Sequence, residues 1–144
     1  MKKFIIIPAL LMLLFMSPLL TSAKSGYYQP AKESDEELVM DLFFSLLLPT
    51  VQDEVCKYYS DSLIECPMVY PYEIKILKME RTNHYRGYIF SVTIEITPVL
   101  GAHNPVGRDQ LTYKITPSDV TLEQFKHQKT FELPPHLQDL KRKQ

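Results

Sequence analysis

The chain has 144 residues, of which 16 are basic and 17 are acidic, and its formal net charge at pH 7 is −1. This length suits a single hydrophobic core. The nearly neutral balance gives no general attraction to nucleic acid, so we expect no nucleic-acid partner. The basic residues 141–143 are accordingly expected to form a solvated tail.

The first 23 residues show the pattern of a secretory signal peptide. Two lysines precede an apolar run at 4–20, and small residues follow that end at Ala23, a suitable last residue before cleavage. An uncleaved membrane anchor is the alternative, but the run is slightly shorter than the roughly 20 residues needed and contains Pro8 and Pro18. We expect a secreted, extracellular protein, or one held in the cell envelope, that is free of the membrane after cleavage.

Two helices are predicted after this leader. Ser34 and Glu37 form the capping-box pattern at the start of a helix. A nearly all-apolar helix then runs over 38–48, and Pro49 should end or kink it. Apolar residues recur at helical spacing in a second, amphipathic helix at about 51–63.

The first helix is apolar nearly all round, whereas a helix that covers one face of a small domain should have a single apolar stripe. Two interpretations stay open. Either most of its sides are buried against the second helix and the sheet, or one side is exposed and binds a second copy of the chain or another exported protein. The candidate interface residues are Leu38, Leu42, Phe43, Phe44 and Leu47.

Beyond the helices, apolar residues alternate with polar ones, as in β-strands. Four strands are predicted, at about 72–81, 88–97, 111–116 and 120–133. The first pattern slips around Leu77 and Met79, which indicates a bulge. The second strand has the clearest dry face, formed by Tyr88, Phe90, Val92, Ile94 and Ile96.

Two helices followed by an antiparallel meander of four strands predict an α+β fold. We expect one domain at 34–144 after a flexible lead-in at 24–33. The topology resembles a cystatin-like or nuclear-transport-factor-like (NTF2-like) half-cone, a likeness that carries no function by itself.

Cys56 and Cys66 are the only cysteines, and an exported protein permits a disulfide between them. On one straight helix they would lie about 15 Å apart, whereas a bridge requires Cα atoms within about 7 Å. The bridge therefore requires the helix to stop near Leu63 and the chain to fold back through Glu65 and Pro67. Two free buried thiols are the alternative, and a catalytic thiol is disfavoured because exported thiols tend to be oxidised.

Catalytic and metal-binding motifs are mostly absent from the sequence. No three glycines have the spacing of a dinucleotide or phosphate loop, and no serine lies in a nucleophile-elbow context. The four histidines include no i, i+4 pair, and the cysteines form no metal-binding knuckle. We therefore expect no cofactor and no metal.

The stretch LGAHNPVGRDQL, residues 100–111, has two interpretations. As a small acid/base site, His103 and Asp109 would share a hydrogen bond and Arg108 would hold an anion. As a rigid corner between strands, its two glycines and Pro105 would shape the backbone. The sequence favours the corner.

Four segments resemble a known family: the helix LVMDLFFSLLLP, the segment PYEIKILKMER, the block GYIFSVTIEITPVLGAHNPVGRDQLTYKI and the ending FKHQKTFELPPH. They are similar to domain-of-unknown-function family 3888, small exported proteins of spore-forming Gram-positive bacteria. The resemblance covers nearly all of the chain after the leader. It implies no particular activity, cofactor or catalytic residue.

The leading functional hypothesis is a non-enzymatic exported module that binds a protein, a cell-wall component or a small apolar ligand. It depends on the missing catalytic motifs and on the unusually apolar first helix. One alternative is a small hydrolytic enzyme that uses His103 and Asp109 in a cavity between helix and sheet. A second alternative is an extracellular folding helper or inhibitor.

Overall fold

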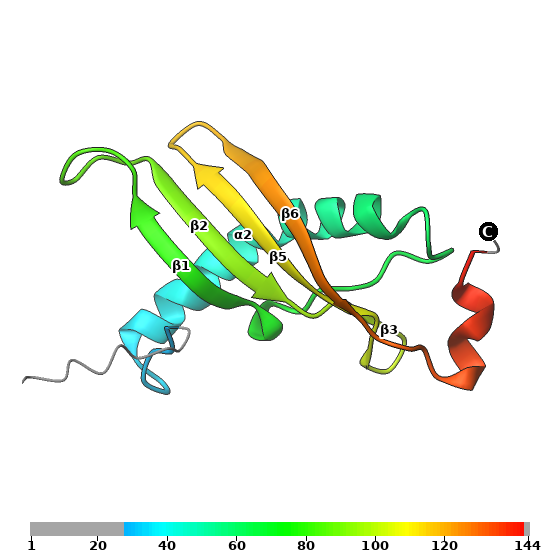
Figure 1. Cartoon of the computed structure of the whole chain (residues 1–144). Helices are drawn as coiled ribbons and strands as arrows, with labels where there is room; N and C mark the ends of the chain where they lie inside the picture. Colours follow the sequence, from blue (N-terminus) through cyan, green and yellow to red (C-terminus); the bar gives the residue numbers. More distant parts are fainter. Residues whose placement is uncertain (1–27, 143–144) are drawn as a thin grey trace, which may run out of the picture.

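The computed structural model describes residues 28–142 and consists of one long helix packed across a four-stranded antiparallel sheet (Figure 1). The sheet has the order β1-β2-β5-β6. Its strands are β1 (Lys75–Arg81), β2 (Phe90–Ile96), β5 (Gly107–Ile115) and β6 (Val120–Thr130). The α+β class and the antiparallel sheet predicted from the sequence are confirmed. The predicted signal peptide at residues 1–23 lies outside the described residues.

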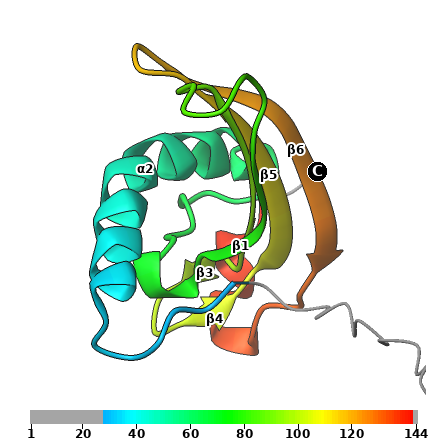
Figure 2. The ribbon, with the colours of Figure 1, turned by 90° about the vertical axis from the view of Figure 1, so that its left-hand side faces the viewer.

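The predicted pair of helices is wrong, because within residues 28–142 the single α-helix is α2 (Asp35–Tyr59), which contains Pro49 and ends before Leu63. Proline removes one backbone hydrogen bond and bends a helix, and Figure 2 shows α2 bending along its length beside the curved sheet. Leu47 and Val51, on either side of the proline, are both buried in the same core. Ending the helix at Pro49 would take one of them out of that core, so packing on both sides sustains the helix through the proline.

Helix α2 begins with a cap that differs slightly from the predicted one. The backbone amide of Glu37 donates to Ser34 Oγ at 3.2 Å, as expected. The Glu37 carboxylate accepts from the backbone amide of Glu33 at 2.6 Å, rather than from that of Ser34. Three acidic residues at 35–37 occupy the first turn, where they oppose the positive end of the helix dipole.

Strand β2 supplies the centre of the core. Its buried residues are Val92, Ile94 and Ile96, which share one apolar cluster with buried residues of α2. Tyr88 precedes the strand and is 61% exposed, so the predicted dry face is two residues too long at this end. The register with β1 shifts between Ile76 and Lys78, which confirms the predicted bulge. A short 3₁₀ helix, η2 (Pro71–Glu73), leads into β1.

The stretch at 100–111 is divided between a hairpin and a strand. Strand β3 (Val99–Leu100) pairs with β4 (Asn104–Pro105), and the turn between them contains His103 with a φ of 60°. Strand β5 then begins at Gly107. The corner interpretation is correct for the first half of the stretch and wrong for the second, which belongs to the main sheet.

The chain after α2 folds back along the helix and is held there by a disulfide. Cys56 and Cys66 are bonded, with their Cα atoms 4.8 Å apart. Gln52 adds a second attachment, because its side-chain oxygen accepts from the backbone amide of Val69 at 3.0 Å. Of the alternatives open from the sequence, the structure therefore contains the bridge, and the helix ends early enough to permit it.

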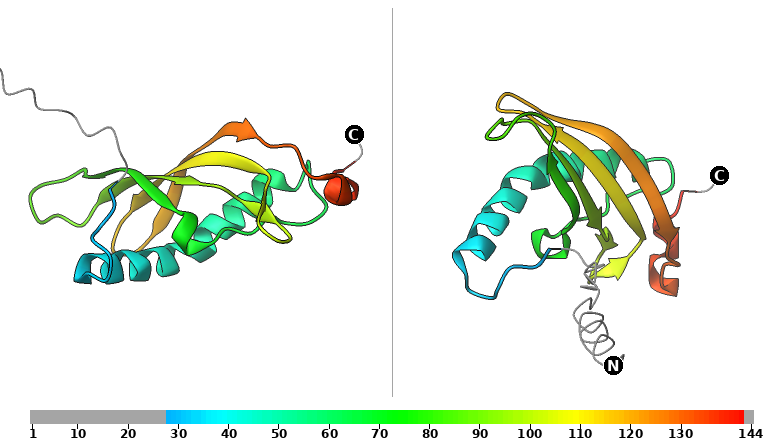
Figure 3. Two further views of the ribbon diagram at one scale, coloured as in Figure 1. Left: turned by 90° about the horizontal axis from the view of Figure 1, so that it is seen from below. Right: turned by 60° about the vertical axis from the view of Figure 1, so that its left-hand side comes forward.

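The C-terminal segment closes the same end of the molecule. The 3₁₀ helix η3 (Pro135–Leu140) follows β6, and Lys141 then forms an isolated antiparallel bridge with Leu63. Arg142 donates from its backbone amide to the carbonyl oxygen of Ser62 at 2.9 Å and from Nε to that of Leu63 at 3.0 Å. Figure 3 shows this segment next to the loop that follows α2.

The five candidate interface residues on α2 are divided between surface and core. Leu38 and Leu42 are exposed and Phe43 is half-buried. Phe44 and Leu47 are buried in the core cluster, so they cannot belong to an interface in this fold. In residues 28–142, no helix combines the length and the apolar character needed to cross a membrane.

Candidate functional site

An aspartate lies in the core near the start of β5. Alternate residues of this strand are buried, and the series of Leu111 and Tyr113 extends back to Asp109, which is 0% exposed. Asp109 is the single buried charged residue within residues 28–142. Burying a carboxyl group costs free energy unless hydrogen bonds compensate the loss of water. The hydrogen-bond partners of Asp109 therefore determine which chemistry is possible at this position.

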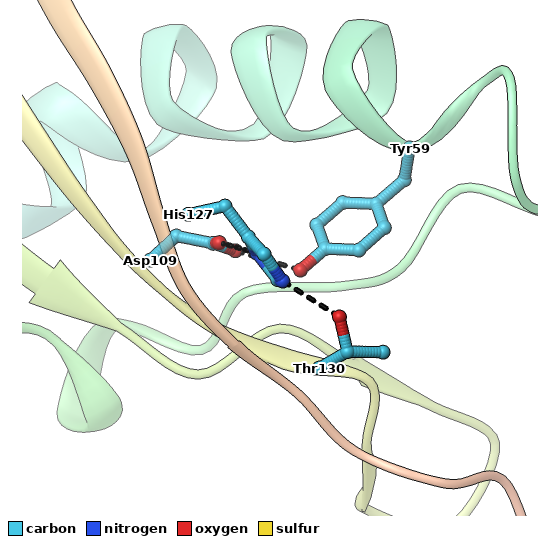
Figure 4. A network of polar contacts seen from close by, with 4 residues as sticks. All are labelled: Tyr59, Asp109, His127 and Thr130. Atoms are coloured by element: carbon cyan, nitrogen blue, oxygen red, sulfur yellow. Dashed lines mark hydrogen bonds and ion pairs between the residues drawn. The ribbon is translucent and has the colours of Figure 1, made fainter.

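The first partner of Asp109 is His127 on β6. The strand register places the two residues opposite one another, and His127 Nδ1 lies 2.6 Å from Asp109 Oδ1. A register shift skips Gln128, and such bulges re-aim the neighbouring side chains. The other ring nitrogen, His127 Nε2, lies 2.7 Å from Thr130 Oγ1 (Figure 4).

The second partner is Tyr59, at the end of α2, whose hydroxyl donates to Asp109 Oδ2 at 2.8 Å (Figure 4). We call Tyr59, Asp109, His127 and Thr130 the polar network. Burial, the Asp109 charge and this hydrogen bond raise the pKa of Tyr59 well above its usual range, so its hydroxyl stays protonated. Burial also raises the pKa of Asp109, although the hydrogen bonds from His127 and Tyr59 oppose that effect.

The hydrogen positions in the network depend on the charge of Asp109. When Asp109 is ionised its carboxylate only accepts, so His127 Nδ1 then carries the hydrogen that it donates to Asp109. In the neutral ring Nε2 is then an acceptor, and the Thr130 hydroxyl donates to it. The network therefore runs in one direction, from the Thr130 hydroxyl through the imidazole to the carboxylate.

Close packing around the network requires a glycine in β5. A Cβ atom at Gly107 would lie 2.1 Å from the Tyr59 hydroxyl oxygen and 3.1 Å from His127 Cε1. Any larger residue would displace the tyrosine or the histidine. The ring of Tyr58 also stacks on that of His127, with 5.6 Å between centroids, which further limits movement of the imidazole.

A cavity of about 410 Å³ lies beside the polar network. This volume falls within the range of roughly 300–1,000 Å³ that is common for small-molecule sites. Tyr59 and Thr130 belong both to the network and to the cavity wall. The rest of the wall has four apolar residues, one hydroxyl and two cations: Leu63, Val106, Phe131, Leu133, Ser62, Lys141 and Arg142. We call this space the C-terminal cavity.

The predicted acid/base pair of His103 and Asp109 is wrong. His103 is exposed in the β3–β4 turn, where its ring centroid lies 4.9 Å from that of Tyr70. The two oxygens of Asp109 instead bond His127 and Tyr59. Arg108 is exposed, and as the neighbour of Asp109 in β5 its side chain points to the opposite face of the sheet. Of the three predicted residues, only Asp109 belongs to the network.

The sequence held a signal for the burial of Asp109. The two-residue period of Leu111 and Tyr113 extends back to Asp109, and a carboxyl group on a dry face marks a buried polar site. The position of His127 opposite Asp109 depends on the bulge at Gln128, for which the sequence gives no signature. Tyr113 is fully buried as well, and its hydroxyl has no partner within residues 28–142.

Metal binding finds no support among the described residues. Within residues 28–142, no three or more His, Cys, Asp or Glu side chains come together in a way that could hold a metal ion. What the site offers is hydrogen bonding, one imidazole and positive charge.

The chain matches the family model described as "Protein of unknown function (DUF3888)" over residues 39–129, which is more than half of its length. The chain therefore belongs to this family. The matched region contains Tyr59, Asp109 and His127, and it ends one residue before Thr130. No curated protein and no solved structure matches the chain.

Proposed function

We propose that this protein is an exported binding module whose C-terminal cavity holds a small amphipathic anion, with an apolar body and a carboxylate head. The composition of the cavity wall carries this proposal. Two cationic side chains, Lys141 and Arg142, adjoin four apolar ones, and no carboxylate from residues 28–142 lines the wall. An apolar ligand without charge would leave those cations unused, and a cationic ligand would be repelled.

The apolar part of the wall supplies most of the binding energy in this proposal. Leu63, Val106 and Leu133 are buried aliphatic residues, and Phe131 adds an aromatic ring. Removing hydrocarbon surface from water is worth about 25 cal/mol per Å², so even a short alkyl chain gains from entering. The polar hydroxyl groups of the wall then fix how the ligand is oriented.

The cationic part of the wall is available to a ligand. Within residues 28–142, neither Lys141 nor Arg142 takes part in an ion pair. Arg142 uses its Nε to hold the Leu63 carbonyl oxygen. A carboxylate that reaches these two side chains would form charge-assisted hydrogen bonds, which are stronger than neutral ones.

Titration calorimetry with three probes of one chain length tests the proposal: octanoate, octylamine and octanol. We expect octanoate to bind with higher affinity than the other two. Lys141→Gln should weaken octanoate binding about tenfold, the equivalent of about 1.4 kcal/mol. Lys126→Gln, which removes an exposed lysine of β6 outside the cavity wall, is the matched control and should not change the affinity.

Two results would contradict the proposal. One is the absence of octanoate binding at millimolar concentration. The other is equal affinity for octanoate and octylamine, because charge would then play no part in recognition.

Export belongs to the proposal, supported by the pattern of residues 1–23. The intact mass of protein recovered from culture medium checks it, because cleavage after Ala23 should leave a chain that begins at Lys24. An uncleaved chain found only in the membrane fraction would contradict it.

A second candidate function is self-association through the N-terminal half of α2. The observation that favours it is a set of four exposed apolar side chains on successive turns, Leu38, Val39, Leu42 and Leu46. Such a patch on a helix can bury itself against the same patch of a second copy. Phe44 and Leu47 are not part of this surface.

Sedimentation velocity over a range of concentrations tests this second candidate. We expect a dimer that Leu42→Asp converts to a monomer. Met79→Asp, which places the same charge at an exposed apolar position of β1, is the control and should leave the dimer intact. A wild-type monomer at all concentrations would remove the hypothesis.

A further inference from the structure

The polar network has the order of groups that nucleophilic acyl transfer uses. Asp109 Oδ1, His127 Nδ1, His127 Nε2 and Thr130 Oγ1 follow one another, with 2.6 Å and 2.7 Å separating the bonded atoms (Figure 4). In this order the imidazole can take the hydroxyl proton while the carboxylate orients the ring. Thr130 also lines the C-terminal cavity, so the hydroxyl end of the network meets the space proposed for a ligand.

We propose that Thr130 is the nucleophile of an esterase site, whose substrates are esters of small apolar carboxylic acids. This inference rests on the proposed binding function and deepens it. The acid released by hydrolysis is the kind of amphipathic anion that the C-terminal cavity is proposed to hold. Product and ligand are therefore the same class of molecule.

The first half of the reaction forms an acyl-enzyme. Thr130 Oγ1 bonds to the carbonyl carbon of the ester while its proton moves to His127 Nε2, and the carbonyl oxygen gains the electron pair. The bond between that carbon and the alcohol oxygen then breaks. His127 gives its proton to the leaving oxygen, so an alcohol departs and the acyl group remains on Thr130.

The second half releases the acid. Water bonds to the acyl carbon as it gives a proton to His127 Nε2, and the bond between that carbon and Thr130 Oγ1 then breaks. His127 returns the proton to Thr130. One ester and one water yield one acid and one alcohol, with no net oxidation and no co-reactant other than water.

The other groups around the site have supporting roles. Asp109 is a positioning residue, because its carboxylate fixes the ring tautomer and stabilises the imidazolium that forms. Tyr59 positions Asp109 in turn, through the hydrogen bond to its second oxygen. Lys141 and Arg142 line the same cavity, where positive charge offsets the negative charge that develops on the carbonyl oxygen.

Hydrolysis of 4-nitrophenyl butyrate by the secreted chain is the measurement. Thr130→Val keeps the side-chain shape without the hydroxyl and should lower kcat/KM at least about 100-fold. Thr130→Ser keeps a hydroxyl and should stay within about tenfold of wild type. Thr121→Val, an exposed position on the same strand, is the matched control and should not change the rate.

Two further readouts separate catalysis from structure. Mass spectrometry of acid-quenched wild-type reactions should find a butyryl group on the peptide that contains Thr130. Asp109→Asn should lower kcat and leave KM unchanged, because its carboxylate acts through His127 and not on the substrate. The thermal midpoint of each variant shows whether it is folded, and Thr130→Ser with the trapped adduct decides the question if Thr130→Val does not fold.

Three results would overturn the inference: wild-type hydrolysis no faster than that of Thr130→Val, an adduct on a residue other than Thr130, or Thr130→Ser without activity. Octanoate binding, measured by calorimetry on wild type and Thr130→Val, separates this failure from that of the proposed function. Binding without hydrolysis overturns the esterase and keeps the binding module. Absence of both octanoate binding and hydrolysis in the wild type overturns both.

Discussion

The two halves of α2 are built from similar apolar residues but differ in how much of that apolar surface is exposed. In the N-terminal half, Leu38, Leu42 and Leu46 are exposed. In the C-terminal half, Val51 and Val55 are 0% exposed. The same half ends at the disulfide and at the polar network.

Dimensions explain the difference better than composition does. A helix of 25 residues is about 38 Å long, whereas four strands about 4.8 Å apart form a layer less than about 20 Å wide. Because α2 crosses the strands (Figure 1), part of it must extend beyond the layer that covers it. The apolar content of a helix therefore does not tell how much of it is buried, because the opposing layer is too narrow to cover the whole length.

Two adjacent leucines in the middle of α2, which point to different faces of the helix, give the largest expected effect. Leu46 is 73% exposed and Leu47 is 3% exposed. Leu47→Ala should lower the free energy of unfolding by about 2–5 kcal/mol, because it leaves a cavity in the core. Leu46→Ala is the matched control, and its effect should stay within about 0.5 kcal/mol. Urea unfolding followed by circular dichroism measures both, and equal effects would contradict the exposure pattern.

The disulfide should have the next largest effect, because it fixes the end of the buried half. Replacing both Cys56 and Cys66 by Ala should cost about 2–3 kcal/mol, as expected for a cross-link that closes a short loop. Thermal and urea unfolding measure the loss. A reductant should destabilise the wild type and have no effect on the double variant. Equal stability of the two proteins without reductant would show that the bridge does not constrain the chain.

Two adjacent tyrosines test the polar network at the end of the same helix half. Tyr59→Phe removes the donor to Asp109 Oδ2 and leaves a buried acceptor unpaired, which should cost about 1–3 kcal/mol. Tyr58 is 43% exposed, and Tyr58→Phe is the matched control, with an expected effect below about 0.5 kcal/mol. Urea unfolding at one pH compares them. A Tyr59→Phe variant as stable as Tyr58→Phe would mean that the hydrogen bond contributes nothing.

The fold could be predicted from the sequence where periodicity was strong, and not where tertiary packing decided. The alternation from Phe90 to Ile96 predicted β2, and the slip near Leu77 predicted its bulged neighbour. The single helix could not be predicted, because Pro49 is a helix breaker by itself. The helix continues through Pro49 because residues on both sides of the proline are buried, and that burial depends on the whole core.

The candidate site was less predictable than the fold, for a similar reason. Asp109 could be identified from its place on the dry face of β5, but its partners come from elements distant in sequence. His127 reaches it through a strand register that contains a bulge, and Tyr59 reaches it from the last turn of α2. Nearness in sequence was a poor guide, because His103 lies in the β3–β4 turn whereas Asp109 belongs to the main sheet.

The pH dependence of stability is the smallest expected effect and the most specific to Asp109. Burial raises the pKa of Asp109 in the folded protein above the unfolded value of about 3.9. Between these two values the folded state keeps a proton that the unfolded state has released, so raising the pH favours unfolding. The wild type should therefore lose stability relative to Asp109→Asn as the pH rises above about 4, by at most about 1.4 kcal/mol per unit.

Urea unfolding of wild type and Asp109→Asn between pH 3 and pH 7, in steps of about half a unit, measures this difference. The same series for Asp41→Asn, which removes an exposed carboxyl group from the N-terminal half of α2, corrects for the loss of one negative charge. If the wild type instead gains stability relative to Asp109→Asn as the pH rises, His127 and Tyr59 stabilise the ionised carboxylate by more than burial destabilises it. In that case Asp109 would be ionised at neutral pH, and its hydrogen bond from Tyr59 would stabilise the buried end of α2.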